Sequence, residues 1–261
     1  MVNNSAKTDV QLQFGNNAAN YVTSTVHAKG EDLAKLVKLL HWNGEETVLD
    51  IATGGGHVAN ALAPLSKKIT AIDLTKEILA ASKKFIESNG HSNVEFLEAD
   101  AENLPFPAET FDIAVCRIAA HHFADIESFV REAFRALKKG GIFLFIDNTA
   151  PEDDEFDEFY NRIEKKRDYS HQRAWKKSEW VRLIEQQGFE LEEMHCLKKS
   201  FSFDNWCNTM ALPEAEKQQL AKEMLQAPAH YQQKFKITQK AGKVNSFQGE
   251  SVLIKAAKPI Q

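Results

Sequence analysis

The stretch that most constrains the fold of this chain covers residues 47–57 and reads TVLDIATGGGH. Its first five residues, 47–51, predict a short buried strand with Asp50 near its carboxyl end. Three glycines follow, and glycine tolerates positive φ and carries no Cβ, so a ligand can approach the backbone closely. The residues from His57 onward predict a helix. A strand, a glycine-rich turn and a helix N-terminus in this order predict a nucleotide site at the edge of an α/β sheet.

The glycine pattern alone leaves two kinds of nucleotide open. Gly54-x-Gly56-x-x-Ala59 fits the dinucleotide fingerprint, and Asp73 ends the next predicted strand, where a carboxylate binds ribose hydroxyls. Asp50 favours a different ligand, because a carboxylate four residues before the first glycine of the pattern would repel a pyrophosphate and suits a positive charge. A nicotinamide-dependent oxidoreductase therefore stands as the alternative to an enzyme that binds a cationic nucleotide. A non-catalytic cofactor-binding protein is a third interpretation.

Further motifs follow in a fixed order. The pattern Asp-x-x-x-Gly-x-Gly from Asp50, followed by Asp73 and Asp100, resembles the class I S-adenosylmethionine-dependent methyltransferases. The run over 93–116 resembles the part of that family in which an acidic residue after the third strand recognises adenine and a Leu-Pro-Phe turn leads into the fourth strand. Residues 137–142 are similar to the family's turn before its fifth strand.

This resemblance covers residues 45–150 and extends to a subgroup of the superfamily. Segment 21–27, Tyr-x-x-Ser-x-x-His, and segment 117–123, Arg-x-Ala-x-His-His-Phe, resemble the small-molecule methyltransferases related to the ubiquinone and menaquinone C-methyltransferases. The C-terminal half shows no matching signature, which puts a quinol substrate in doubt. The resemblance therefore implies methyl transfer to a small-molecule acceptor whose identity stays open.

The resemblance implies S-adenosylmethionine as the cofactor and assigns a role to each motif residue. Asp50 is expected to bind the ammonium group of the methionine part, directly or through water. Asp73 is expected to accept both ribose hydroxyls, and Asp100 the adenine amino group. The remaining expected cofactor contacts are Tyr21, Ala52, Gly54, Gly56, Leu74, Ala101 and Arg117. The alternative for the three acids is helix capping or turn formation.

Two histidines are the candidates for catalysis. His121 and His122 follow the fourth predicted strand, and histidine titrates near neutrality, so one of them is a candidate base or acceptor-binding group. Tandem histidines also cap helices or bind backbone groups, and that alternative stays open. Arg117 is expected to contact the methionine end of the cofactor or to pair with a local acid. The scattered histidines and cysteines predict no metal site.

Alternating strand and helix patterns predict a doubly wound α/β fold with a seven-stranded, mostly parallel sheet covered on both faces. The predicted strands are 47–51, 69–73, 94–98, 111–116, 142–147, 189–197 and 251–256. The predicted helices are 31–41, 57–64, 75–88, 125–137, 154–167, 178–187 and 213–226. Ser178 is expected to cap its helix and Gly188 to end it. The resemblance implies a Rossmann-like strand order 3-2-1-4-5-7-6, with the last strand antiparallel.

The chain is expected to divide into an N-terminal part and one catalytic domain. Residues 1–40 should form a tail, loose over 1–13, and lid helices, because the family folds such a segment over the cofactor. Residues 41–261 should form the S-adenosylmethionine-binding domain. Two stretches exceed the minimal fold, at about 148–177 and 199–249, and loops at the carboxyl edge of such a sheet carry substrate specificity.

The acceptor site is expected between the N-terminal lid, the two histidines and the 148–177 insert. That insert carries Arg162, Arg167 and His171. Its arginines favour an anionic acceptor, although a solvated helix face explains them equally well.

Composition bounds the class of protein. The 261 residues, 43% of them hydrophobic, suit one α/β domain with additions. A net charge of -5 and a pI near 6.0 argue against a protein that binds nucleic acid, and no apolar run approaches the ~18 residues of a membrane span. The polar N-terminus lacks a signal-peptide core, and three scattered cysteines suit a reducing compartment. We therefore expect a cytoplasmic enzyme, monomeric or homodimeric.

Overall fold

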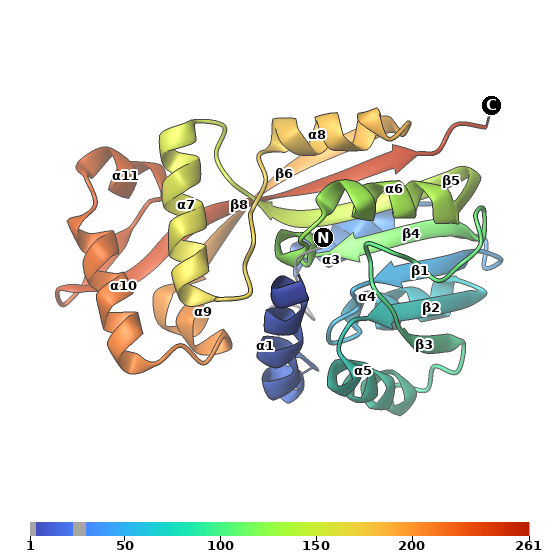
Figure 1. Ribbon diagram of the computed structural model, residues 1–261, viewed down its shortest axis with the longest axis horizontal. Helices are drawn as coiled ribbons and strands as arrows, with labels where there is room; N and C mark the ends of the chain where they lie inside the picture. The colour runs from blue at the N-terminus through green and yellow to red at the C-terminus, as the bar shows by residue number, and fades with distance from the viewer. Residues whose placement is uncertain (1–3, 23–29, 261) are drawn as a thin grey trace.

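The computed structural model of the protein describes residues 4–22 and 30–260, with the side chains of 5–15 and 30–260. Its centre is one twisted sheet flanked by helices (Figure 1). The strands are β1 (Thr47–Ile51), β2 (Lys68–Asp73), β3 (Val94–Glu98), β4 (Phe111–Arg117), β5 (Leu137–Thr149), β6 (Glu190–Ser202), β7 (Thr238–Lys240) and β8 (Lys243–Ala257). The helices are α1 (Asn4–Val22), α3 (Glu31–Lys38), α4 (His57–Leu62), α5 (Lys76–Ser88), α6 (Ile126–Ala136), α7 (Asp154–Arg167), α8 (Lys177–Gln186), α9 (Phe203–Thr209), α10 (Glu214–Gln226) and α11 (Ala229–Lys234), with 3-10 turns η1 (Ala63–Leu65) and η2 (Ala120–His122).

The strands stand in the order β3-β2-β1-β4-β5-β8-β6, and the short β7 pairs with β8. Strands β1 to β5 run parallel to one another, while β8 lies antiparallel between β5 and β6. Because β8 is the last strand of the chain, the predicted order 3-2-1-4-5-7-6 is confirmed, and so is the doubly wound, mostly parallel sheet. Strand β7 is an addition that forms a hairpin with the start of β8.

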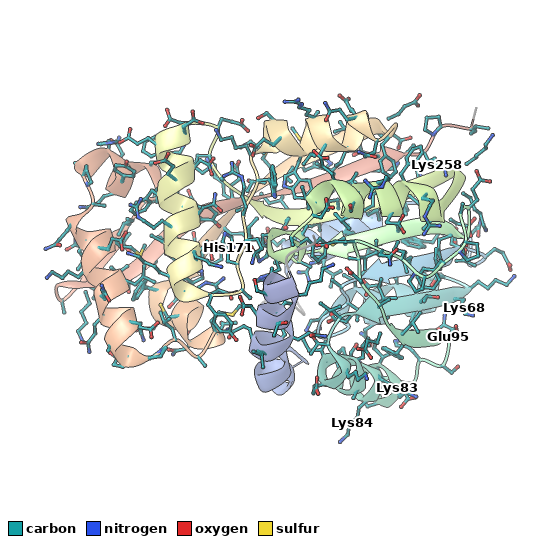
Figure 2. The ribbon with its side chains drawn as sticks, in the orientation of Figure 1. Lys68, Lys83, Lys84, Glu95, His171 and Lys258 are labelled. Atoms are coloured by element: carbon teal, nitrogen blue, oxygen red, sulfur yellow. The ribbon has the colours of Figure 1, made fainter. Side chains whose placement is uncertain are left out.

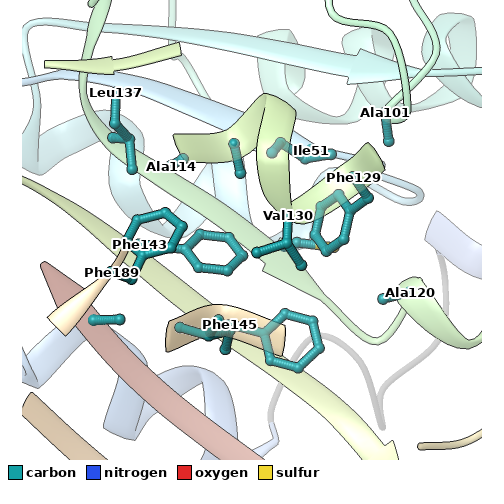
Figure 3. Packing of buried hydrophobic residues seen from close by; sticks show 14 of the residues in the cluster. Ile51, Ala101, Ala114, Ala120, Phe129, Val130, Leu137, Phe143, Phe145 and Phe189 are labelled. Atoms are coloured by element: carbon teal, nitrogen blue, oxygen red, sulfur yellow. The ribbon is translucent and has the colours of Figure 1, made fainter. Parts of the chain in front are cut away.

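Helices cover both faces of the sheet, as is usual when strands run parallel. On one face, α6 packs Phe129 against Phe145 of β5 (Figure 3). On the same face, α8 packs Trp180 against Phe145, with 4.2 Å between the ring centroids. On the other face, α3 and α4 bury Leu36 and Leu62. The covered faces leave the carboxyl edge of the sheet as the place where side chains from several strands meet.

The N-terminal part differs from the loose tail expected over residues 1–13. The chain is helical from its fourth residue, and α1 stands against α5 beside the carboxyl edge of the sheet (Figure 1). Lys7 of this helix forms ion pairs with Asp100 and Glu102 at 2.5 and 2.6 Å. The prediction of a loose tail is therefore wrong for the described residues, because long-range contacts hold a segment whose polar composition suggested none.

Strands β6 and β8 run beyond the rest of the sheet and carry a second lobe, seen at the left of Figure 1. The expected insert at 199–249 is consequently shorter, since β6 ends at Ser202 and β8 begins at Lys243. Helices α7, α9 and α10 pack on these strand ends around a separate apolar core that includes Trp206 and Phe247. Backbone pairing between β6 and β8 continues beyond the apolar segments from which the bounds of these strands were predicted.

The ends of α8 show one wrong and one correct cap prediction. Ser178 does not cap this helix, because α8 begins one residue earlier and the Ser178 hydroxyl donates to the Glu152 carboxylate at 2.5 Å. The Glu179 carboxylate instead accepts from the backbone N–H of Lys176 at 2.8 Å. Gly188 follows the helix with φ +98°, which confirms the expected left-handed position.

We predict that Gly56→Ala destabilises the fold more than Gly90→Ala. Both glycines have positive φ, +78° and +85°, so alanine pays about 1–2 kcal/mol at either position. A Cβ on Gly56 would also lie 2.2 Å from Oγ of Ser82 on α5, whereas nothing lies within 4 Å of one on Gly90. Overpacking typically adds about 1–3 kcal/mol. Urea denaturation of both variants measures the difference, and equal losses of unfolding free energy would contradict it.

Candidate active site

A pocket opens at the carboxyl edge of the sheet, between the ends of β1, β2 and β4 and helix α1. The space between these elements, counted together with the solvent at the open mouth, is about 1020 Å³. Its lining includes eight of the predicted cofactor contacts: Asp50, Ala52, Gly54, Asp73, Leu74, Asp100, Ala101 and Arg117. Gly56 is not among the described residues that line the pocket. The side chain of Tyr21 and the residue His27 lie outside the described part of the chain.

Asp50 anchors the turn after β1. Its Oδ2 accepts from the Thr53 hydroxyl at 2.6 Å and from the backbone N–H of Ala59 in α4 at 3.1 Å. Burial, with a smaller contribution from the neighbouring Asp73, raises the pKa of Asp50 to about 7 against these hydrogen bonds. No described residue donates a hydrogen bond to Oδ1, so one carboxylate oxygen holds the turn and the other is left for a ligand.

Asp73 ends β2 on the opposite side of the glycine turn. Its Oδ2 accepts from the backbone N–H of Gly54 at 3.1 Å, and its Oδ1 from that of Thr75 at 3.0 Å. Burial raises the pKa of Asp73 to about 6 despite these hydrogen bonds. Each oxygen keeps a lone pair, so the carboxylate can also accept from a pair of hydroxyl groups.

Two non-glycine residues in the lining adopt positive φ. Ala52, just after β1, has φ +54°, and Ile118, just after β4, has φ +55°. Such backbone costs free energy and is concentrated at functional sites. Ala52 was predicted as a contact, whereas no sequence signal pointed to Ile118, because an isoleucine gives no hint of a left-handed conformation.

Helix α1 stands at one side of the pocket, where Lys7, Val10 and Phe14 contribute to the lining. Asp100 accepts from Lys7 through Oδ2 and from the backbone N–H of Glu102 through Oδ1, at 2.9 Å. Burial lowers the pKa of Lys7, but the hydrogen bonds to the two carboxylates outweigh it, and the pKa is raised. Sequence reasoning missed Lys7, since nothing local links it to acids more than 90 positions away.

Arg117 at the end of β4 pairs with a local acid, which is one of the two roles considered for it, while its contact with a cofactor stays a prediction. It lines the pocket, and its guanidinium binds both oxygens of Asp32 in α3, with Nε–Oδ2 at 3.0 Å and Nη2–Oδ1 at 3.1 Å. Both side chains are buried. Burial raises the pKa of Asp32, but the Arg117 hydrogen bonds prevail and lower it. The ion pair therefore fixes Arg117 in place, and Asp32 is a site-supporting residue that the sequence did not reveal.

The two adjacent histidines, His121 and His122, lie in different environments. His121 donates its backbone N–H to Asp147 of β5 at 2.8 Å, and its Nδ1 lies 2.7 Å from the same carboxylate. Burial lowers the pKa of His121, but the charge of Asp147 outweighs it, so the pKa is raised. His121 is absent from the described lining of the pocket. Its imidazole is buried and held to the sheet by Asp147.

His122 does line the pocket, where its ring meets that of Phe14 edge-on at 4.9 Å between centroids. Burial and the charge on His121 together lower the pKa of His122 to about 4. At neutral pH this imidazole is uncharged and can accept a proton. Of the two predicted catalytic histidines, only His122 has access to a ligand in the pocket.

The residues of the 148–177 insert that were expected at the acceptor site also lie in different places. Arg162 pairs with Glu223 on α10, and Arg167 pairs with Glu164, so both arginines serve the second lobe. His171 lies between α7 and the sheet (Figure 2), with its ring centroid 5.5 Å from that of His121. The arginines therefore give no support to an anionic acceptor, whereas the loop that follows α7 does reach the histidines.

The described parts of the chain are residues 4–22 and 30–260. No group of three or more His, Cys, Asp or Glu side chains there is arranged to hold a metal ion. Within the same ranges, no helix is both long and apolar enough to cross a membrane.

Comparison with known proteins identifies the family. The methyltransferase domain family matches residues 49–145. The chain is 36% identical over 249 residues to the uncharacterised methyltransferase YcgJ of Bacillus subtilis (strain 168), spanning 95% of this chain and 98% of YcgJ. The solved structure of YcgJ matches 88% of this chain and 98% of its own with a TM-score of 0.85 and 34% identity. That of the BH2331 protein from Bacillus halodurans C-125 matches 88% and 100%, with a TM-score of 0.86 and 56% identity.

A second relative matches a shorter part of the chain. The chain is 34% identical over 127 residues to the ubiquinone/menaquinone biosynthesis C-methyltransferase UbiE of Bartonella henselae, spanning 47% of each protein. Together with the near full-length match to YcgJ, it shows that the chain belongs to the methyltransferase family. The class I S-adenosylmethionine-dependent methyltransferase expected from the motifs is confirmed at this level, and the nicotinamide-dependent alternative is set aside.

We predict that the free energy of unfolding of the ligand-free protein depends on pH through Asp50. Its pKa is raised from 3.8 to about 7 in the fold. The protonated form is thus favoured by folding, so this stabilisation is complete below about pH 4 and is lost as pH rises towards 7. Asp50→Asn stays neutral at every pH. Between pH 5 and 7.5 the free energy of unfolding of the wild type should fall by about 1–3 kcal/mol more than that of this variant.

Urea denaturation of both proteins at the two pH values measures this difference, and other titrating groups cancel because both proteins share them. Parallel losses in wild type and Asp50→Asn would show that Asp50 does not carry the raised pKa.

Proposed function

We propose that the enzyme binds S-adenosylmethionine in the pocket at the carboxyl edge and transfers its methyl group to a small-molecule acceptor beside His122. The observation that carries this proposal is the convergence of three carboxylates, Asp50, Asp73 and Asp100, from the ends of three adjacent strands onto one pocket. Burial raises the pKa of the first two, so a cationic ligand that pairs with them relieves an electrostatic cost.

The donor and acceptor groups of the pocket fit this cofactor. In the proposal, Asp50 binds the ammonium group through Oδ1, Asp73 accepts the ribose hydroxyls, and Asp100 accepts the adenine amino group. The backbone at Ala52 and Gly54 lines the methionine part, and the nearest atom to a Cβ on Gly54 is 4.0 Å away, so the turn leaves room for a ligand. Leu74 and Ala101 contact the adenine, Gly56 shapes the turn, and Tyr21 stays a predicted contact.

When bound, S-adenosylmethionine supplies a sulfonium methyl group whose departure leaves a neutral thioether. The leaving group is good, so the protein has chiefly to align the acceptor with the methyl group and to exclude water. Phe14, Phe123 and Ile118 give the pocket beside His122 an apolar wall. Arg117 adds a fixed positive charge at the end of β4, held by Asp32. The protein's contribution to the chemistry is thus position and a dry environment.

We also propose that residues 1–40 act as a lid over the domain formed by 41–261. Three of the side chains that enclose the pocket come from α1, and the Lys7 ion pairs fasten this helix to the loop after β3. A cofactor enclosed by both the sheet edge and α1 can leave only when α1 moves.

The three free cysteines suit a reducing compartment, and we propose that the enzyme acts in the cytoplasm.

The first test concerns Asp73→Asn. The amide keeps an acceptor for the turn but loses the charge-assisted bonds to the ribose, so affinity for S-adenosylhomocysteine should fall about 10- to 100-fold, equivalent to ~1.5–3 kcal/mol. Calorimetry measures the affinity. Transfer of a tritiated methyl group to a small-molecule extract should fall in parallel.

The matched control is Asp112→Asn, because Asp112 binds Lys138 and Thr47 at the opposite end of β4 from the pocket. Its cofactor affinity should equal that of the wild type. An Asp73→Asn protein that is folded and binds S-adenosylhomocysteine as tightly as the wild type would refute the assignment of Asp73.

The second test concerns the lid. Lys7→Met removes both ion pairs while keeping the length of the side chain, so S-adenosylhomocysteine should dissociate several-fold faster. Lys83→Met removes an exposed ion pair on α5 and serves as the control. Stopped-flow displacement measures both rates. If Lys7→Met and the wild type release the ligand at the same rate, α1 does not gate the pocket.

A further inference from the structure

A chain of buried polar groups leads from the second lobe to His122. Asp168, the residue after α7, is fully buried, and its Oδ1 accepts from the Ser170 hydroxyl at 2.6 Å and from the Ser170 N–H at 2.9 Å. The oxygen of that hydroxyl lies 3.2 Å from Nδ1 of His122. These groups belong to the 148–177 insert, whereas His122 belongs to the sheet edge, so two parts of the chain meet at this histidine.

We propose that Asp168 and Ser170 are positioning residues that hold His122 as the proton acceptor for a methyl acceptor bearing an ionisable N–H, O–H or acidic C–H group. The inference rests on the proposed function and deepens it, because it assigns the end of the second lobe to the reaction and narrows the class of acceptor.

The hydrogen-bond geometry selects one tautomer of His122. Ser170 has a single hydroxyl hydrogen, and its 2.6 Å contact with a carboxylate is shorter than its 3.2 Å contact with the imidazole. The hydroxyl therefore donates to Asp168, and its oxygen accepts from His122. The proton of the neutral imidazole thus lies on Nδ1, and Nε2 carries the lone pair. Among the described residues, no group donates to Nε2.

Asp168 also has an oxygen that is ready for a positive charge. Its Oδ2 is buried without a hydrogen-bond partner in the described structure and lies 3.9 Å from Nε2 of His122. A buried, unpaired carboxylate oxygen costs free energy. Proton uptake by His122 creates an imidazolium beside this oxygen, so part of that cost is recovered only when the proton has been transferred.

Burial, together with the charge on His121, keeps His122 neutral until then. The charged or titratable groups that act on it are His121 in η2, Asp147 near the end of β5, Asp168 after α7, and His171 on the following loop. Asp147 raises the pKa of His121, which favours its charged form, and that charge opposes a second positive charge on His122. This arrangement favours an acceptor that delivers its proton as the methyl group arrives.

The proposed reaction transfers a methyl group from sulfur to the acceptor atom and a proton from that atom to His122. The acceptor atom uses the electron pair of its bond to hydrogen, or a lone pair, to form the bond to the methyl carbon. The carbon–sulfur bond breaks, and its electron pair stays on sulfur as a neutral thioether. The proton released from the acceptor atom moves to Nε2 of His122, which becomes an imidazolium next to Asp168. An acceptor without an ionisable hydrogen would have no use for this arrangement.

Nitrogen-15 NMR of the histidine side chains tests the inference without a known acceptor, with the His122 signal assigned from His122→Gln. In the wild type at neutral pH, His122 should be almost entirely the Nδ1–H tautomer. Ser170→Ala and Asp168→Asn should each lower the tautomer ratio about tenfold, the equivalent of one hydrogen bond. Asp153→Asn is the control, because Asp153 caps the other end of α7 and asparagine caps equally well.

A His122 that carries its proton on Nε2, or a tautomer ratio unchanged in both variants, would overturn the inference. Calorimetry on the same samples keeps it separate from the proposed function. Asp168→Asn should bind S-adenosylhomocysteine as the wild type does, while its kcat for methyl transfer to the active extract fraction should fall 10-fold or more with KM little changed. A wild type that fails to bind S-adenosylhomocysteine would sink the proposed function instead.

Discussion

The buried carboxylate of Asp50 is the constraint on which the site depends. One of its oxygens ties the end of β1 to the turn at Thr53 and to the first turn of α4 at Ala59. The same residue is almost fully shielded from water, so its charge needs a partner in the pocket. The Asp50 side chain therefore has two effects. It orders the glycine turn, and it favours a positively charged ligand beside that turn.

The second lobe depends on a different constraint, the pairing of β6 with β8. These strands continue past the sheet and provide the base on which α7, α9 and α10 pack. The loop after α7 is thereby brought back to the carboxyl edge, where Ser170 meets His122. Helix α1 closes the edge from the other side (Figure 1). In the proposed function, the edge of the sheet holds the cofactor and the added lobe shapes the space for the acceptor.

The sequence predicted the parts that local patterns determine. The bounds of β1 and β3 were correct because an apolar run flanked by turn residues defines a short strand, and the last strand was correctly placed between the fifth and sixth by family resemblance. The missed residues, Lys7, Asp32 and Asp168, act through partners far along the chain, and no single-sequence pattern links such pairs. Their polarity suggested solvent exposure, whereas their partners allow Asp32 and Asp168 to be buried and Lys7 to be half-buried.

The central claim is that the carboxylate-lined pocket binds S-adenosylmethionine rather than a dinucleotide. Isothermal titration of the full chain with S-adenosylhomocysteine and, separately, with NAD tests it most directly. The account predicts saturable one-site binding of S-adenosylhomocysteine, competition by S-adenosylmethionine, and no heat of binding with NAD. Saturable binding of NAD, with none of S-adenosylhomocysteine, would contradict it.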